Sequence, residues 1–303
     1  MADIVELPSP FFVPPPPPES VAQWYEQNEP YITECLGNSF PGPHSSFKAI
    51  DLYITDIIIN HLLREGRERR SSVTVVDLGS GGGGVTVHLT RALLRAFRGE
   101  LSLSVTGVTI TDRAVSESCA VAAAEEVSSN VKFVTGNYHS LDQSTFPDGS
   151  CDCVTLINSL CHATDVGLVL KEAYRVLRPG GIVVIKDFFV LSPTHMADLG
   201  VPEEEYSDHI RRHAENFCMG IFDGECLTAA IERCFRSCRF VPLGEDTFAG
   251  REFAACCFKD KDPKTREFSS FGKVVFKGFA PILQTLRQCP FDEGLWIGTK
   301  ADP

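Results

Sequence analysis

The sequence predicts an α/β fold in which a doubly wound sheet of mostly parallel strands has helices on both faces. Residues 75–84 read Val-Val-Asp-Leu-Gly-Ser-Gly-Gly-Gly-Gly, an apolar run that ends in a glycine-rich turn. Residues 85–97 then have helical composition and spacing, and further apolar runs alternate with helical stretches up to residue 187. The order strand, glycine turn, helix is the first unit of a doubly wound nucleotide-binding fold.

The glycine turn indicates that the backbone approaches a ligand closely, because glycine has no Cβ and tolerates positive φ. Gly79, Gly81 and Gly84 formally satisfy the dinucleotide fingerprint G-x-G-x-x-G. Because residues 81–84 are all glycine, this spacing does not discriminate between nucleotide ligands. The aspartate two residues before the first glycine discriminates better, because it gives the pattern D-x-G-x-G-x-G from Asp77 to Gly83.

This pattern resembles motif I of the class I S-adenosylmethionine-dependent methyltransferases. In that family the acidic residue helps to hold the amino-acid end of the cofactor, and the glycines make room for its sugar and methionine portions. The resemblance implies S-adenosylmethionine as cofactor, with contacts from Asp77, Gly79, Ser80, Gly81 and Gly83. The alternative is a glycine turn without a ligand, although four glycines cost conformational entropy that function usually explains.

The next apolar run, 101–110, ends in Thr109-Ile110-Thr111-Asp112 and leads into a helical stretch over 115–127. Folds of this kind contact the ribose at the end of the second strand. The segment Val-Thr-Gly-Val-Thr-Ile-Thr resembles the cyclopropane-synthase and tocopherol-methyltransferase branch. The resemblance makes Thr109, Thr111 and Asp112 candidate cofactor contacts and leaves open which of the last two faces the ribose. Asp112 as the N-cap of the following helix is the alternative.

Three later segments support the same resemblance. Gly136-Asn137 stands where the family usually has Gly-Asp-Ala and contacts the adenine, and an asparagine can still hydrogen-bond the base. Phe146–Asp152 resembles the family's segment before the fourth strand, predicted over 153–158. Leu177-Arg178-Pro179-Gly180-Gly181 resembles its turn before the fifth strand, predicted over 182–185. The ordered matches over 73–187 imply a seven-stranded, Rossmann-like methyltransferase sheet.

Four regions are expected along the chain. Residues 1–20, with Pro14 to Pro18, predict a disordered proline-rich tail, with docking to a proline-binding partner as the minority interpretation. Residues 21–70, with an apolar helix around 50–63 and the aromatic residues Trp24, Tyr25 and Tyr31, resemble an N-terminal helical lid; a merely structural cap is the alternative. Residues 71–187 are the cofactor-binding core. Residues 188–303 combine a helical insertion after the fifth strand with the last strands of the same domain.

The C-terminal region adds two features. Tyr206, His209, His213 and Phe217 have helical spacing, but the two histidines lack a third ligand, so no metal site is predicted. Runs 235–243 and 294–299 predict the final antiparallel pair of strands. Between them, 268–286 has apolar residues at mostly helical intervals with Lys273 and Lys277 on the polar side. Core packing or a homodimer face is the expected role, and contact with a lipid surface is the alternative.

Composition excludes several classes. A chain of 303 residues with 43% apolar content can bury one α/β core, and its net charge of -12 argues against a nucleic-acid partner. The sequence has no run of about 18 or more apolar residues, so no membrane span is expected, and no basic region followed by an apolar stretch at its N-terminus, so no secretory signal is expected. Its twelve cysteines lack the paired spacing of a zinc site. We therefore expect reduced thiols and a cytoplasmic location, with a thiol or metalloid substrate as an outside alternative.

Catalysis is expected where the strands end, beside the fourth strand. His162, in the segment that follows Asn158, is the first candidate for a general base or for orienting the acceptor. A histidine that is simply hydrogen-bonded in a strand–helix turn is the alternative. Asp187, at the end of the fifth strand, and Tyr138 are further catalytic candidates, and Asn158 and Tyr138 are also candidate cofactor contacts. Tyr31 and Phe217 are weaker candidates.

The resemblance implies methyl transfer to a small molecule, and the lid and the second-strand segment favour a lipid or isoprenoid acceptor. Aromatic faces could stabilise a carbocation formed by methyl addition to an alkene. An O- or N-methyltransferase of a polar metabolite has the same core. A non-catalytic, methyltransferase-like assembly module is the alternative from another class, against which the intact Asp77 and glycine turn weigh.

Overall fold

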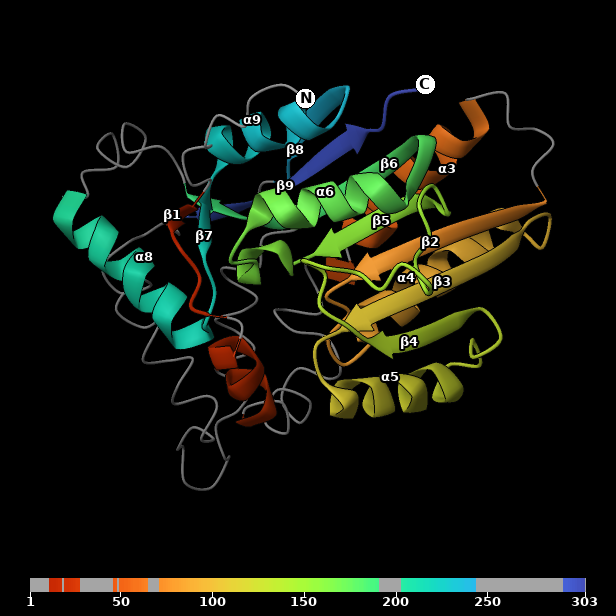
Figure 1. Cartoon of the computed structure of the whole chain (residues 1–303), viewed down its shortest axis with the longest axis horizontal. Helices are drawn as coiled ribbons and strands as arrows, with labels where there is room; N and C mark the ends of the chain where they lie inside the picture. Colours follow the sequence, from red (N-terminus) through yellow and green to blue (C-terminus); the bar gives the residue numbers. More distant parts are fainter. Residues whose placement is uncertain are drawn as a thin grey trace.

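The computed structural model describes residues 11–17, 19–27, 46–47, 49–64, 71–190, 203–243 and 291–302. Figure 1 shows a twisted sheet between two layers of helices, with the carboxyl ends of β2, β3 and β5 directed toward the side that carries β1, β7 and α8. This is the α/β class that the sequence predicts. The edge where the parallel strands end is therefore the place where a ligand site is expected.

Five parallel strands form the centre of the sheet, in the order β4-β3-β2-β5-β6. Their bounds are β2 Ser72–Leu78, β3 Ser102–Thr109, β4 Val131–Thr135, β5 Cys151–Ile157 and β6 Leu177–Val190. The predicted final pair is confirmed: β9 (Phe291–Thr299) runs antiparallel to both β6 and β8 (Ser237–Pro242). These seven strands are the predicted sheet. β6 is longer than the predicted fifth strand, because it pairs with β9 as far as Val190.

Two short strands extend the sheet beyond this prediction. β7 (Ile221–Asp223) runs parallel to the end of β6, and β1 (Phe11–Val13) runs antiparallel to β7. The prediction of a disordered tail over 1–20 is therefore wrong for Phe11–Val13. The physical reason is that the Phe11 ring stacks on Phe222, with ring centroids 4.5 Å apart, while the backbone completes the sheet edge.

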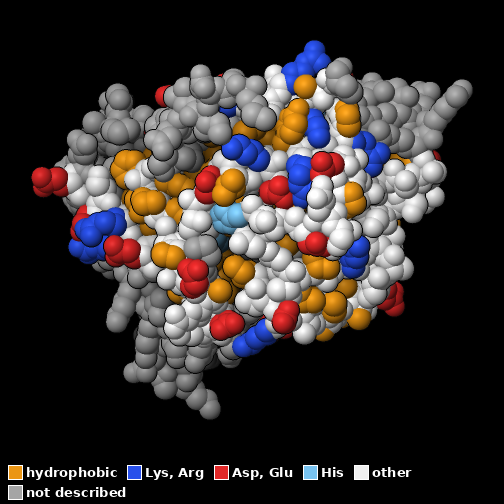
Figure 2. Space-filling view, viewed as in Figure 1, with side chains coloured by type: hydrophobic (Ala, Val, Ile, Leu, Met, Phe, Trp, Pro, Cys, Tyr) orange, Lys and Arg blue, Asp and Glu red, His pale blue; other side chains and the backbone are white. Residues whose placement is uncertain are grey.

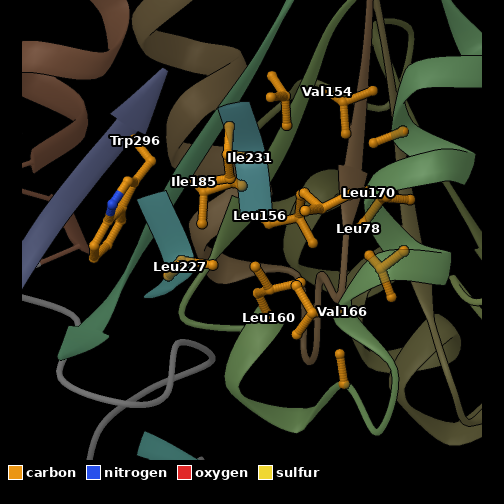
Figure 3. Close-up of a cluster of buried hydrophobic side chains, with 14 of the residues drawn as sticks. Leu78, Val154, Leu156, Leu160, Val166, Leu170, Ile185, Leu227, Ile231 and Trp296 are labelled. Atoms are coloured by element: carbon orange, nitrogen blue, oxygen red, sulfur yellow. The ribbon is translucent and has the colours of Figure 1, made fainter. Parts of the chain in front are cut away.

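Helices cover both faces of the sheet and enclose two apolar cores. α6 (Val166–Val176) and α9 (Gly224–Cys234) pack on one face, where Leu156, Ile185 and Trp296 meet them (Figure 3). α4 (Gly84–Phe97) packs on the other face, together with α3 (Thr55–Arg64) and the short π-helix η1 (Ile50–Ile54). The structure also contains α5 (Asp112–Ala124), the 3-10 helix η2 (Leu160–His162) and α8 (Glu203–Phe217).

The helix predicted around 50–63 is confirmed as η1 and α3, whose residues Ile50, Ile54, Ile58 and Leu62 are buried in the second core. Residues 19–27 form a further helix. The insertion predicted after the fifth strand contains α8, and the backbone over 206–217 is helical as its spacing predicts. The side chains of Tyr206, His209, His213 and Phe217 lie outside what the structure describes, as do Tyr31 and the whole 268–286 segment.

Charges of both signs are interspersed with apolar side chains on the face shown in Figure 2. Within the described ranges, no helix combines the length and the apolar character needed to cross a membrane. The eight cysteines in these ranges form no disulfide with one another.

Candidate functional site

The glycine turn closes the end of β2 against β3. The amides of Gly79 and Ser80 donate to the carbonyl of Val108 over 2.8 and 2.9 Å. Gly79 and Gly83 have φ of +84°, and a Cβ there would lie 2.4 Å from Ser159 Cβ and 2.5 Å from Ser118 Cβ, respectively. Gly81 has φ +50°, and none of the residues that the structure describes has an atom within 4 Å of such a Cβ. Two glycines thus allow tight packing, and the middle one borders open space.

Asp77 is buried at the end of β2 and holds neighbouring elements together. Its Oδ2 accepts from the hydroxyl of Thr86 over 2.5 Å, and its Oδ1 accepts from the hydroxyl of Thr155 over 2.7 Å. Burial raises the pKa of Asp77, and the two threonine hydrogen bonds oppose that rise. The carboxylate therefore ties β2 to the first turn of α4 and to β5.

Ser80 is the residue of the turn whose polar group lacks a protein partner. Its side chain is only 7% exposed, and its hydroxyl makes no hydrogen bond with any of the described residues. Gly107 leaves room for it, because a Cβ on Gly107 would lie 2.9 Å from Ser80 Cβ. Buried polar groups are normally satisfied, so this hydroxyl fits a ligand contact.

The ends of β3 and β4 bring the predicted second group together. Thr111 is the N-cap of α5, and its hydroxyl accepts from the amide of Ala114 over 3.2 Å. Asp112 as N-cap is therefore wrong: it is the first residue of α5, is exposed and accepts from the hydroxyl of Thr135. Thr109 is buried, and its carbonyl accepts from Gly136 over 2.8 Å. Asn137 is exposed, and its Oδ1 accepts from the amide of His139 over 2.9 Å.

Asn158 begins a buried polar chain that the sequence did not predict. It follows β5 with φ +52°, and its Nδ2 donates to Ser46 Oγ over 3.0 Å. Its Oδ1 accepts from Lys186 Nζ over 3.0 Å, and Lys186 in turn pairs with Glu293 over 2.5 Å. Lys186 is fully buried and Glu293 is 1% exposed. The chain links the lid to the end of β5 and to β9.

Two of the predicted catalytic candidates are engaged with the backbone. The hydroxyl of Tyr138 donates to the carbonyl of Ser159 over 3.1 Å, and burial raises its pKa well above the usual range. Asp187 is fully buried and accepts from the amides of Cys161 and Phe188 over 3.0 and 2.9 Å. Burial raises the pKa of Asp187 to about 6. Both residues shape the loop that carries His162.

His162 contacts the lid directly. Its Nδ1 lies 3.0 Å from the carbonyl of Cys218, and its Nε2 lies 2.9 Å from the hydroxyl of Tyr25. Burial lowers the pKa of His162 to about 4, so the ring is neutral near pH 7. A carbonyl only accepts hydrogen bonds, so Nδ1 carries the proton and Nε2 accepts from Tyr25. The sequence predicted His162 and the aromatic lid separately, but not this contact between them.

No three His, Cys, Asp or Glu side chains gather as metal ligands in the part of the chain that the structure describes. The predicted cofactor contacts instead line up along the carboxyl edge of β2, β3, β4 and β5. Further residues of the candidate site that the sequence did not single out are Ser46, Thr86, Thr155 and Lys186.

Comparison with known proteins gives the family of this core. Residues 76–185 match the family model described as a methyltransferase domain. The ubiquinone/menaquinone biosynthesis C-methyltransferase UbiE of Marinomonas sp. (strain MWYL1) is 33% identical over 119 residues, covering 39% of this chain and 44% of that protein. The sterol 24-C-methyltransferase ERG6A of Gibberella zeae is 23% identical over 238 residues, covering 73% and 56%. The chain spans about half the length of these curated relatives.

Solved structures show the same fold. The cyclase SpnF superposes with a TM-score of 0.66 at 18% identity, covering 96% of this chain and 99% of that chain. Geranyl diphosphate methyltransferase in complex with GPP and sinefungin superposes with a TM-score of 0.55 at 18% identity, covering 82% and 77%. At such identities the likeness establishes the fold, and the family match adds the domain type. The resemblance predicted from the sequence is therefore confirmed: the chain carries a class I S-adenosylmethionine-dependent methyltransferase domain.

Proposed function

We propose that this chain transfers the methyl group of S-adenosylmethionine to a small acceptor of lipid or isoprenoid type. The observation that carries the cofactor assignment is the turn itself, in which the Ser80 hydroxyl is buried without a protein partner and Gly81 borders open space. Ser80 would hold the cofactor together with the backbone of Gly79, Gly81 and Gly83, and Asp77 would keep that turn in place. The bound cofactor would supply a methyl group on a sulfonium cation.

The Tyr25–His162 pair favours carbon as the methyl acceptor. With a pKa of about 4, His162 is a weak base, poorly matched to removing a proton from an alcohol. A carbocation produced by methyl addition to an alkene is a strong acid, so a weak, neutral base suffices to take its proton. Nδ1 of His162 already carries a proton and Nε2 accepts from Tyr25, so the hydroxyl oxygen of Tyr25 would take the proton of the carbocation while its own proton passes to Nε2. Trp24 and Tyr25, whose rings meet edge to face, also provide aromatic surface beside His162. Two curated relatives are named as C-methyltransferases of quinone biosynthesis and of sterols.

The cofactor assignment is tested by calorimetric titration with S-adenosylmethionine. We expect Ser80→Ala to weaken binding at least tenfold without lowering the melting temperature, because the hydroxyl makes no contact that stabilises the described fold. Ser102→Ala, an exposed serine at the start of β3, is the matched control. No binding to the unmodified chain would refute the proposal and favour a non-catalytic assembly module.

The acceptor class is tested by incubation with methyl-labelled cofactor and separate quinone, sterol, prenyl-diphosphate and polar-metabolite fractions. Label on carbon in an isoprenoid fraction supports the proposal. Label on oxygen or nitrogen of a polar metabolite would select the rival O- or N-methyltransferase. Label in protein or RNA alone would refute a small-molecule acceptor. The cytoplasmic location, the homodimer and the lipid-surface contact stay predictions from the sequence.

A further inference from the structure

The N-terminal segment contacts one turn of the chain directly and is linked to the same turn a second time through His162. We call residues 11–17 and 19–27 the strap, and Cys218, Met219 and Gly220 the turn before β7. At the first point a Cβ on Gly220 would lie 2.6 Å from Cε1 of Phe11 and 2.9 Å from Cδ of Pro15. At the second point Tyr25 reaches His162, which donates to the carbonyl of Cys218. Figure 1 shows β1 lying along β7 at this edge.

The turn before β7 is itself fixed to the loop that carries His162. The amide of Gly220 donates to the carbonyl of Cys161 over 2.7 Å, and the amide of Met219 donates to Ala214 over 3.0 Å. Cys218 has φ +52°, and its carbonyl lies 3.0 Å from Nδ1 of His162. Both contacts of the strap therefore depend on the turn before β7.

A residue larger than glycine at position 220 would push the strap away from the turn before β7. Real Cβ atoms essentially never approach other heavy atoms within 3.0 Å, so a side chain there would displace Phe11 or Pro15. Phe11 also stacks on Phe222 and pairs with it in β1 and β7, so its displacement would remove a ring stack and a strand pairing together. The helix over 19–27 follows this strand after a few residues and carries Tyr25.

We propose that Gly220 is a positioning residue: its missing side chain lets β1 seat on the turn before β7 and thereby holds Tyr25 against His162. The effect of Gly220 on catalysis rests on the proposed function, but the contact between the strap and the turn before β7 does not. The strap is accordingly an integral part of the site.

The test compares Gly220→Ala with Gly167→Ala, a glycine in the first turn of α6. A Cβ on Gly167 would meet only Asp165 Oδ1, at 3.2 Å, so this control adds the same methyl away from the strap. We expect amide hydrogen exchange of residues 19–27 to accelerate at least tenfold in Gly220→Ala and to stay unchanged in the control. In a histidine NMR titration, we expect the pKa of His162 to rise from about 4 toward its ordinary value of 6.5, because water reaches the ring.

Wild-type exchange and wild-type titration in Gly220→Ala would overturn the proposal. If that variant does not fold, Phe11→Ala takes its place, because it removes the stacked ring without adding an atom; unchanged exchange over 19–27 would then overturn it equally. Neither readout needs cofactor or acceptor. If the unmodified chain transferred no methyl group, the proposed function would be refuted, while the proposal that Gly220 positions the strap would be unaffected.

Discussion

The hydroxyl of Tyr25 donates a hydrogen bond to Nε2 of His162 over 2.9 Å, although the two residues are 137 positions apart in the chain. The direction of the bond follows from the other ring nitrogen, which must donate to the carbonyl of Cys218. Their rings meet edge to face, with centroids 5.4 Å apart. The contact joins the N-terminal helix to the loop after β5, where the acceptor is expected.

Removing this hydroxyl should affect the reaction more than the fold. We expect Tyr25→Phe, which keeps the ring, to lower kcat about a hundredfold and to leave the Kd for S-adenosylmethionine within twofold. Tyr174→Phe on α6, whose ring packs against Phe235, is the matched control. An unchanged kcat for Tyr25→Phe would show that the pair serves only to hold the lid.

The stability of the fold should depend on pH through the partly buried His162 and the buried Asp187, which act in opposite directions. The pKa of His162 falls from 6.5 to about 4, so its contribution is present above pH 6.5 and is lost as pH falls toward 4. The pKa of Asp187 rises from 3.8 to about 6, so its contribution is present below pH 3.8 and is lost as pH rises through 6. Each is worth on the order of 3 kcal/mol, and the two nearly cancel between pH 4 and 6.

Substituting one of the two residues at a time reveals the pH dependence of stability that the other contributes. Relative to the unmodified chain, His162→Asn should gain stability as pH falls from 7 to 5, because only the Asp187 contribution is left. Asp187→Asn should lose stability over the same range. Urea denaturation at the two pH values measures both changes, and parallel shifts in the two variants would contradict the assignment.

Two glycines of the turn offer a matched pair of substitutions. Both have positive φ, so alanine costs about 1–2 kcal/mol at either position. At Gly83 the added Cβ would also lie 2.8 Å from the backbone Cα of Ser118, so the urea midpoint of Gly83→Ala should fall further than that of Gly81→Ala. Gly81→Ala should keep the fold and lose at least tenfold in cofactor affinity, because its Cβ enters the space beside Ser80. Tight binding by Gly81→Ala would place the cofactor elsewhere.

The sequence predicted those parts of the molecule that local patterns determine. Apolar runs ending in glycine or a polar residue located β2 and β3, and the glycine turn located the cofactor edge. β1 was missed because three residues in a proline-rich segment form a strand only by pairing with β7, some 200 residues away. The Tyr25–His162 contact and the burial of Lys186 beside Glu293 were missed for the same reason. Both depend on elements brought together by the fold, which spacing in one sequence does not reveal.

The buried pair of Lys186 and Glu293 should be the most sensitive charge interaction in the described structure. Lys186→Met leaves the Glu293 carboxylate, 1% exposed, without its ammonium partner, and such a loss costs about 3–5 kcal/mol. Replacing both residues, as in Lys186→Met with Glu293→Leu, should recover most of that loss, because neither charge of this pair is then left in the core. The exposed pair of Arg211 and Asp208 is the control, for which Arg211→Met should cost less than about 1 kcal/mol. Urea denaturation of the three variants and the unmodified chain measures these differences. A double variant as unstable as Lys186→Met alone would show that Lys186 matters through its hydrogen bond to Asn158 instead of through charge compensation.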